Sequence, residues 1–308
     1  VQWANGKPAF LPASIYNRLP SALVGDEVNT NVMAGTLVLF IPVAWAATLF
    51  GWRALARPGK TVAVVASLSL PVVVILSQSR GALLALALAG LVLLALRWRL
   101  GWLGMPIGAA IGVFASWRVG LERFAELFNV GSSVGGLVGR PEIWSRALYA
   151  IHDFPYTGVG MGLFGRVAAL LYPFFTVGPE VAVSHAHNLA LQVAVDLGLP
   201  GLIAWSSLFM SIFAACWQVY QQGRRRGDVW LAGLGAGLFG SQVAMAGHGL
   251  VDAVTWGTRP AVLVWVVWAV AFAAINLIAR TALAPNGQDG NRLQSSMATQ
   301  PVPVHLSH

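Results

Sequence analysis

Two histidines lie one residue apart in SHAHN, residues 184–188, directly before a long apolar run. Because histidine titrates near neutral pH, His185 or His187 could serve as a general base or bind a metal ion. In a helix, residues two apart point about 200° from each other and would not share one metal, whereas in an extended stretch they would share a face. No cysteine lies nearby and the closest acids lack ligand spacing. We therefore expect no metal, which leaves a base or a polar helix entrance capped by Ser184 or Asn188.

Further ionisable residues stand at the edges of apolar runs. His248 and Asp252, in HGLVD, are one helical turn apart, which predicts either a structural hydrogen bond or a buried pair facing the same cavity. Arg80, in QSRG, lies where two apolar runs meet. An ionisable residue at such a boundary is a candidate functional group, and the alternative is an interfacial arginine whose guanidinium reaches the headgroups.

Arginines also occur in the segment that precedes SHAHN. Arg140 and Arg146 carry guanidinium groups, whose planar forks suit the oxygens of phosphate. An arginine cluster beside a membrane indicates an anionic headgroup or a diphosphate. For Arg146 a structural alternative exists, because Glu142 lies one helical turn away and can pair with it.

The apolar runs that position these residues are long enough to cross a bilayer. The chain of 308 residues is 57% hydrophobic and only 10% charged, far below the charged fraction of soluble domains. The runs are continuous, which indicates helices of about 20 residues rather than barrel strands. We predict an all-α polytopic membrane protein with about seven transmembrane helices, at residues 32–51, 61–78, 81–97, 101–117, 197–220, 229–251 and 261–279. The single cysteine, Cys216, lies in one run and cannot form an internal disulfide.

Basic residues predict which side of the membrane each loop occupies. The loops at 52–60, 97–100 and 221–228, together with Arg280 and the C-terminal tail that follows it, hold ten of the 19 Lys and Arg residues but only two of the 11 acids. The positive-inside rule assigns this face to the cytoplasm. The formal charge of +8 therefore reflects topology and attraction to anionic lipid, and it requires no nucleic-acid partner.

This topology predicts five segments: an external N-terminal segment (1–31), four transmembrane helices (32–117), a long external loop (118–196), three further helices (197–281) and a disordered cytoplasmic tail (282–308). A loop as long as 118–196 is uncommon unless it carries function. ERFAELF and RPEIWSRALYAIHD within it show the pattern of short amphipathic helices, the second with Pro141 in its first turn. Such helices would lie at the membrane surface over a cavity.

The loop also contains GMGLFG, residues 160–165, which matches G-x-G-x-x-G. This pattern indicates dinucleotide binding only between a strand and a helix of a βαβ unit, and no parallel sheet is expected here. We interpret the glycines as a tight backbone turn.

Five stretches together resemble the O-antigen ligase and polymerase superfamily of bacterial envelope proteins, in family order over residues 29–252. They are NTNVMAGTLVLFIP, SQSRGALLALALAG, GRPEIWSRALYAIHDFPYTGVGMGLFG, SHAHNLALQVAVDLGLPGL and GHGLVD. The resemblance implies an inverting glycosyltransferase in the bacterial inner membrane, with its active site on the periplasmic face. It implies transfer of a glycan from an undecaprenyl diphosphate carrier to an acceptor hydroxyl, with no nucleotide sugar, cofactor or metal.

The resemblance also implies residue roles. Arg80 and Arg140 would bind the diphosphate, with Arg146 as a further candidate. His187, which precedes Asn188, matches the His-Asn pair of the family and would act as base. His185 would be its supporting neighbour, and Asn188, His248 and Asp252 are possible supporting residues.

Several functional alternatives remain open. We favour a ligase with lipid A core or a similar glycolipid as acceptor, over a polymerase acting on another glycan repeat or a protein O-glycosyltransferase. An anion transporter of the bicarbonate type would need polar groups near the middle of the membrane. A third possibility is a non-catalytic assembly subunit. Family members have more spans than we count, so we expect this chain to lack N-terminal helices.

Overall fold

The computed structural model describes residues 30–77, 79–98, 100–119, 139–178 and 183–283, and within them all regular structure is helical. This confirms the predicted all-α class. Residues 122–128 (ERFAELF), the segment 1–29 and the tail 284–308 lie outside the described residues. The elements are α2 (Thr30–Leu37), α3 (Ile41–Leu49), α4 (Arg57–Ser77), α5 (Arg80–Arg97), η2 (Gly101–Leu103), α6 (Gly104–Val119), α8 (Arg140–Asp153), α9 (Phe164–Leu171), α10 (Leu189–Arg226), α11 (Val229–Gly249), η3 (Arg259–Ala261) and α12 (Val262–Leu283).

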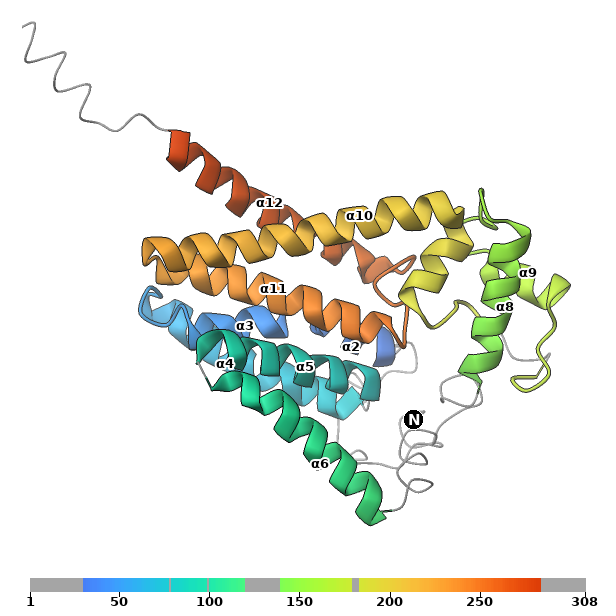
Figure 1. Ribbon diagram of the computed structural model, residues 1–308, viewed down its shortest axis with the longest axis horizontal. Helices are drawn as coiled ribbons and strands as arrows, with labels where there is room; N and C mark the ends of the chain where they lie inside the picture. The colour runs from blue at the N-terminus through green and yellow to red at the C-terminus, as the bar shows by residue number, and fades with distance from the viewer. Residues whose placement is uncertain (1–29, 78, 99, 120–138, 179–182, 284–308) are drawn as a thin grey trace, which may run out of the picture.

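Six of the predicted membrane spans appear as helical segments of sufficient length and apolarity within the described residues. The remaining one, predicted at 101–117, corresponds to α6, which has 16 residues and is preceded by the 3-10 turn η2. In Figure 1, α6 runs from the far end of α5 towards the side on which α8 and α9 lie. It thereby carries the chain between the two ends of the bundle, as a fourth span would.

Two spans differ from their predicted form because of proline or glycine. The first divides into α2 and α3, with Pro42 in the first turn of α3, because proline lacks the N–H that would continue the preceding helix. The fifth begins at Leu189 instead of 197. It is interrupted at Gly198, whose φ of 71° is left-handed, two residues before Pro200.

Helix α11 is the centre of the bundle and the most buried span, in contact with α3, α5 and α10. Its glycines allow this close packing. A Cβ at Gly235 would lie 2.2 Å from the backbone nitrogen of Tyr220 on α10, and one at Gly237 would lie 2.9 Å from the Cα of Val43 on α3. Small residues let membrane helices approach closely, where dispersion contacts stabilise their association.

The outer surface of the bundle is apolar, as a surface in contact with lipid must be. Large hydrophobic side chains such as Val62, Leu68, Ile203 and Val262 are at least 60% exposed. Patches of this extent are rare on soluble monomers. The chain is therefore a multi-pass membrane protein.

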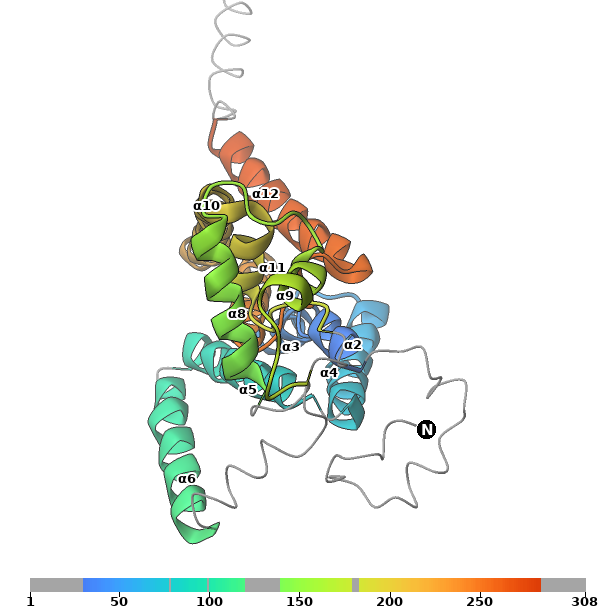
Figure 2. The ribbon, with the colours of Figure 1, turned by 90° about the vertical axis from the view of Figure 1, so that its right-hand side faces the viewer.

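The bundle has two chemically different ends. We name the histidine end after His185, His187 and Asp252, and the arginine end after Arg53, Arg97 and Arg224. Helices α8 and α9 cover the histidine end, and Figure 2 views the molecule from this side, with α8 lying across the helix ends. The arginine end lies at the turn between α10 and α11, on the left of Figure 1.

Candidate active site

The SHAHN segment is not helical; α10 begins directly after it, at Leu189. Asn188 is the N-cap, since its side-chain oxygen accepts a hydrogen bond from the backbone N–H of Leu191 at 3.0 Å. Its side-chain nitrogen donates to the carbonyl of Leu250 at 3.0 Å. Asn188 therefore both starts α10 and ties it to the end of α11. Of the two predicted caps, Asn188 and not Ser184 holds the position.

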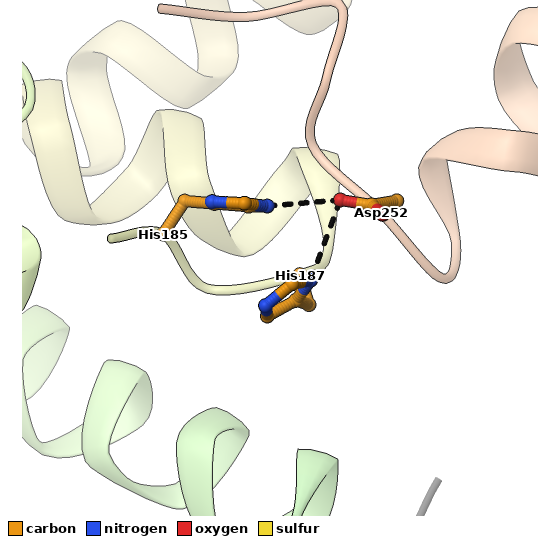
Figure 3. A group of neighbouring side chains, drawn as sticks. All are labelled: His185, His187 and Asp252. Atoms are coloured by element: carbon orange, nitrogen blue, oxygen red, sulfur yellow. Dashed lines mark hydrogen bonds and ion pairs between the residues drawn. The ribbon is translucent and has the colours of Figure 1, made fainter. Parts of the chain in front are cut away.

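His185 is held on both ring nitrogens. Its Nε2 lies 2.9 Å from Asp252 Oδ1 (Figure 3). Its Nδ1 lies 2.8 Å from Ser184 Oγ. Asp252 comes from the segment that follows α11, and its Oδ1 also accepts from the backbone N–H of Ala253. With both nitrogens engaged, the ring of His185 is fixed in orientation.

His187 faces the same carboxylate with more freedom. Its Nδ1 lies 3.4 Å from Asp252 Oδ1, close enough for an ion pair when the ring is protonated but without hydrogen-bond geometry. The other ring nitrogen points away from Asp252 (Figure 3). His187 has φ of 48°, the single positive φ among the described residues other than glycine. Such a conformation costs about 1–3 kcal/mol and persists where surrounding contacts enforce it, often at functional sites.

A buried network below the segment supplies these contacts. Gln192 Oε1 accepts from the backbone N–H of Ala186, between the two histidines, at 2.6 Å, and its Nε2 donates to Asp196 Oδ1 at 2.9 Å. Asp196 also accepts from Trp256 Nε1 at 2.9 Å and from the backbone N–H of Gly162 at 3.3 Å. Gln192 was not among the site residues predicted from the sequence. Its position one helical turn before an acid in an otherwise apolar run was the available signal.

The glycine-rich stretch packs against this network. Gly158, Gly160 and Gly162 have φ of 64°, 97° and 71°, which confirms the predicted tight turn. A Cβ at Gly158 would lie 2.5 Å from the backbone carbon of Asp196, so only glycine permits the approach. The turn follows a helix, and no strand occurs in the described part of the chain, so it is unlike a dinucleotide-binding loop.

Arg140 is the cation of the site. It begins α8, is only 8% exposed, and its Nε has no hydrogen-bond partner. Burial lowers the pKa of its guanidinium and the charge of Asp252 raises it, but an arginine stays protonated in proteins. Its charge also acts on His187. A buried cation without an ion pair in the described structure is costly unless an anion binds beside it.

The electrostatics separate the roles of His187 and Asp252. Burial lowers the pKa of His187, and the charges of His185 and Arg140 lower it further, against the opposing effect of Asp252. Burial raises the pKa of Asp252, but hydrogen bonding and the charges of both histidines outweigh it and hold the pKa well below its usual value. At neutral pH, His187 is therefore neutral and Asp252 is charged, which is the combination that a general base and its orienting carboxylate require.

Two further predicted residues lie at the same end in different environments. Arg80 is the first residue of α5, and the adjoining Gly81 packs against Val251 and His248. His248 is 2% exposed, and its carbonyl accepts from the backbone N–H of Asp252. The side-chain hydrogen bond between His248 and Asp252 is not formed, because the Asp252 carboxylate turns to His185.

Arg146 pairs with Glu142, which was the structural alternative to a role in binding phosphate. Its Nη2 lies 3.3 Å from Glu142 Oε1, and its Nε donates to the carbonyl of Pro173. Glu142 also accepts from three backbone N–H groups, at residues 175–177, and fastens that loop to α8. A role for Arg146 in binding diphosphate stays a prediction, with part of its guanidinium already occupied.

His185, His187 and Asp252 also have the composition of a metal site. Ligand atoms of His185, His187 and Asp252 lie within 4.8 Å of one another. The non-helical backbone brings the two histidine rings close together, with their centroids 4.1 Å apart. Two imidazoles and a carboxylate suit several divalent transition metals. The charge of Arg140 opposes a cation at this position and favours an anion.

A family model described as O-antigen ligase matches residues 62–206 of the chain. The matched range includes Arg80, Arg140 and SHAHN, whereas Asp252 lies beyond it. No curated protein matches the chain significantly.

Proposed function

Because this chain belongs to the O-antigen ligase/polymerase superfamily, we propose that it is a membrane glycosyltransferase using a lipid-linked glycan. The donor is an undecaprenyl diphosphate-linked glycan, and the acceptor is a hydroxyl group on lipid A core or a similar glycolipid. The reaction takes place at the histidine end, which the charge distribution assigns to the periplasmic face of the inner membrane, with the C-terminus in the cytoplasm.

His187 accepts the proton in this reaction. The acceptor O–H gives its proton to the ring nitrogen of His187 that points away from Asp252, while the acceptor oxygen bonds to the anomeric carbon. The bond from that carbon to the diphosphate oxygen breaks on the opposite face, so the anomeric configuration inverts. Asp252 stabilises the imidazolium that forms, at 3.4 Å from its Nδ1.

Arg140 stabilises the diphosphate leaving group with its positive charge. The diphosphate gains negative charge as the bond to the sugar breaks, and fixed cations in a desolvated site stabilise that charge in the transition state. Arg140 is buried and has no counter-ion in the described structure, and Arg80 lies at the same end. The observation that carries the proposal is a neutral, conformationally strained histidine together with a buried arginine that forms no ion pair within the described residues.

The placement of the ionisable groups favours surface chemistry over anion transport. His185, His187, Arg140 and Asp252 gather at one end of the bundle, outside the spans, whereas a transporter binds its substrate near the membrane centre. Polymerase and protein O-glycosyltransferase activities use the same donor chemistry. They are distinguished by which acceptor supports turnover.

The proposal is tested by reconstituting the purified protein with undecaprenyl diphosphate-linked glycan and a panel of acceptors. His187→Ala is expected to lower the transfer rate by roughly 10²- to 10⁴-fold, the usual contribution of a general base. Arg140→Ala is expected to lower it by roughly 10²-fold or more through loss of leaving-group stabilisation. Transfer that persists undiminished in both variants refutes the assignment.

Two matched controls come from the same end of the protein. His152 on α8 has an 87% exposed side chain, and Arg259 in η3 is also exposed, so His152→Ala and Arg259→Gln should keep wild-type rates. A parallel assay with a chelator tests whether transfer depends on a metal ion bound by the two histidines and Asp252. Loss of transfer with EDTA and its recovery with one added divalent metal would replace the base assignment with a metal-assisted mechanism.

A further inference from the structure

A cavity of about 580 Å³ lies at the arginine end, bounded by the ends of α3, α5 and α10 and by the start of α11. Three arginines line it, Arg53, Arg97 and Arg224, and they come from three separate segments of the chain. Nothing in the proposed transfer reaction uses this cavity, because the residues that line it belong to the arginine end. The turn between α10 and α11 at that end lies opposite α8 and α9 (Figure 1).

The arginines are positioned by neutral groups instead of by carboxylates. Arg97 Nε donates to the carbonyl of Leu49 at 2.9 Å, and Arg224 Nη1 lies 3.3 Å from the hydroxyl oxygen of Tyr220. The Tyr220 hydroxyl in turn donates to a backbone carbonyl of α5. These bonds orient the guanidinium groups without neutralising them.

Acidic residues are absent from the described lining of the cavity. Asp228 stands nearby in the α10–α11 turn, but its carboxylate caps α11 by accepting from the backbone N–H of Leu231 at 2.9 Å. The cavity therefore concentrates three positive charges in a concave site with partly apolar walls, where the field is focused.

We propose that this cavity binds the phosphate group of an anionic phospholipid. Guanidinium groups suit phosphate oxygens, and basic pockets between membrane helices are typical sites for acidic headgroups. The rest of the lining matches the remainder of such a lipid, because Phe50, Trp52 and Leu96 present apolar surface beside the arginines. The volume exceeds the need of a free phosphate ion, which favours a headgroup with its glycerol. The inference is independent of the proposed glycosyl transfer.

The test uses the full chain purified in detergent, with binding measured by native mass spectrometry. Phosphatidylglycerol, zwitterionic phosphatidylcholine and inorganic phosphate are added in separate titrations. Wild type should retain phosphatidylglycerol in preference to phosphatidylcholine. Arg53→Gln/Arg224→Gln should weaken retention by roughly tenfold or more, given the usual contribution of each basic residue near an acidic headgroup.

The control is Arg57→Gln/Arg225→Gln, which removes the same charge from exposed residues outside the cavity lining. It should retain phosphatidylglycerol within about twofold of wild type, as expected for residues that do not contact the headgroup. The single variant Arg53→Gln, whose guanidinium makes no hydrogen bond within the described structure, gives the same comparison with the fold least disturbed. Circular dichroism monitors helix content in every variant.

Each result decides the proposal. Selective loss of phosphatidylglycerol in the cavity variants, with weak displacement by inorganic phosphate, supports a lipid site. Strong binding of inorganic phosphate that the cavity variants abolish supports the phosphate site and assigns it to a free ion. Equal losses in the cavity and control variants, or no preference of wild type for phosphatidylglycerol and no phosphate binding, would overturn it.

Discussion

The two ends of the bundle both collect ionisable side chains, but they hold them in different ways. At the histidine end, Asp252 and His187 are buried, and each is fixed by contacts from a distant part of the chain. At the arginine end, Arg53 and Arg224 are exposed, and Arg224 interacts with a residue one helical turn away. The first arrangement has the rigidity that proton transfer requires, and the second suits an anion that exchanges with its surroundings.

The difference has an energetic basis. A buried polar group that loses its partner costs about 1–3 kcal/mol, so the histidine end is sensitive to single substitutions. An exposed guanidinium contributes little to stability, so the arginine end should tolerate them. Substitutions at the two ends therefore test whether the contrast is functional.

Among substitutions that leave His187 and Arg140 in place, the largest effect is expected for Asp252→Asn. The change keeps the shape of the side chain but removes the charge that orients His185 and stabilises protonated His187, so transfer should fall by roughly 10²-fold or more. The measurement is the initial rate with saturating donor. Asp153→Asn on α8, an exposed acid, is the control. A rate within about twofold of wild type for Asp252→Asn would remove the carboxylate from the mechanism.

A smaller effect is expected for Gln192→Leu, which removes the hydrogen bonds to Ala186 and Asp196. We expect kcat to fall roughly tenfold with KM little changed, because His187 loses its fixed position while the donor site remains. Thermal stability should also fall, by about 1–3 kcal/mol of unfolding free energy. The exposed Gln218 on the same helix provides the control Gln218→Leu. A stability loss without any change in kcat would make Gln192 purely structural.

The pH profile should show the effect of burial on His187. Because its pKa is lowered, the ring stays neutral as pH falls past the ordinary histidine value of about 6.5, and kcat/KM should decline only below that point. Asp252 raises the pKa of His187, so in Asp252→Asn the acid limb of the residual activity should move to still lower pH. An acid limb above pH 6.5 in wild type would contradict this ordering.

The smallest effect is expected at the other end of the bundle. Arg53→Gln/Arg224→Gln should leave the transfer rate within about twofold of wild type, because distant sites with no shared contacts behave independently. The rate is measured in the same reconstituted system with lipid composition held constant. A tenfold loss would show that the two ends are coupled, and the contrast between them would no longer hold.

Local patterns in the sequence anticipated much of this structure. Continuous apolar runs predicted the spans, and the glycines of residues 160–165 predicted a tight turn, in which Gly160 and Gly162 have positive φ. His187 and Asp252 were also identified as candidates from their residue types and positions. The break before Ile41 was not predicted, although Pro42 was visible, because membrane helices often accommodate proline within a continuous span. Gln192 was missed because an isolated amide carries no signal until its partners are known.

The amino-acid sequence alone was enough to predict that this chain is helical and membrane-spanning, with its ionisable residues at the ends of the spans. These features follow from transfer free energies and backbone hydrogen bonding, which act residue by residue. The pairing of Asp252 with His185, 67 residues away, instead of with His248, one turn away, follows from the packing of the helices. That choice depends on α10 and α11 packing side by side, which brings the start of one helix to the end of the other. It also depends on a non-helical SHAHN segment, which brings the two histidine rings close together.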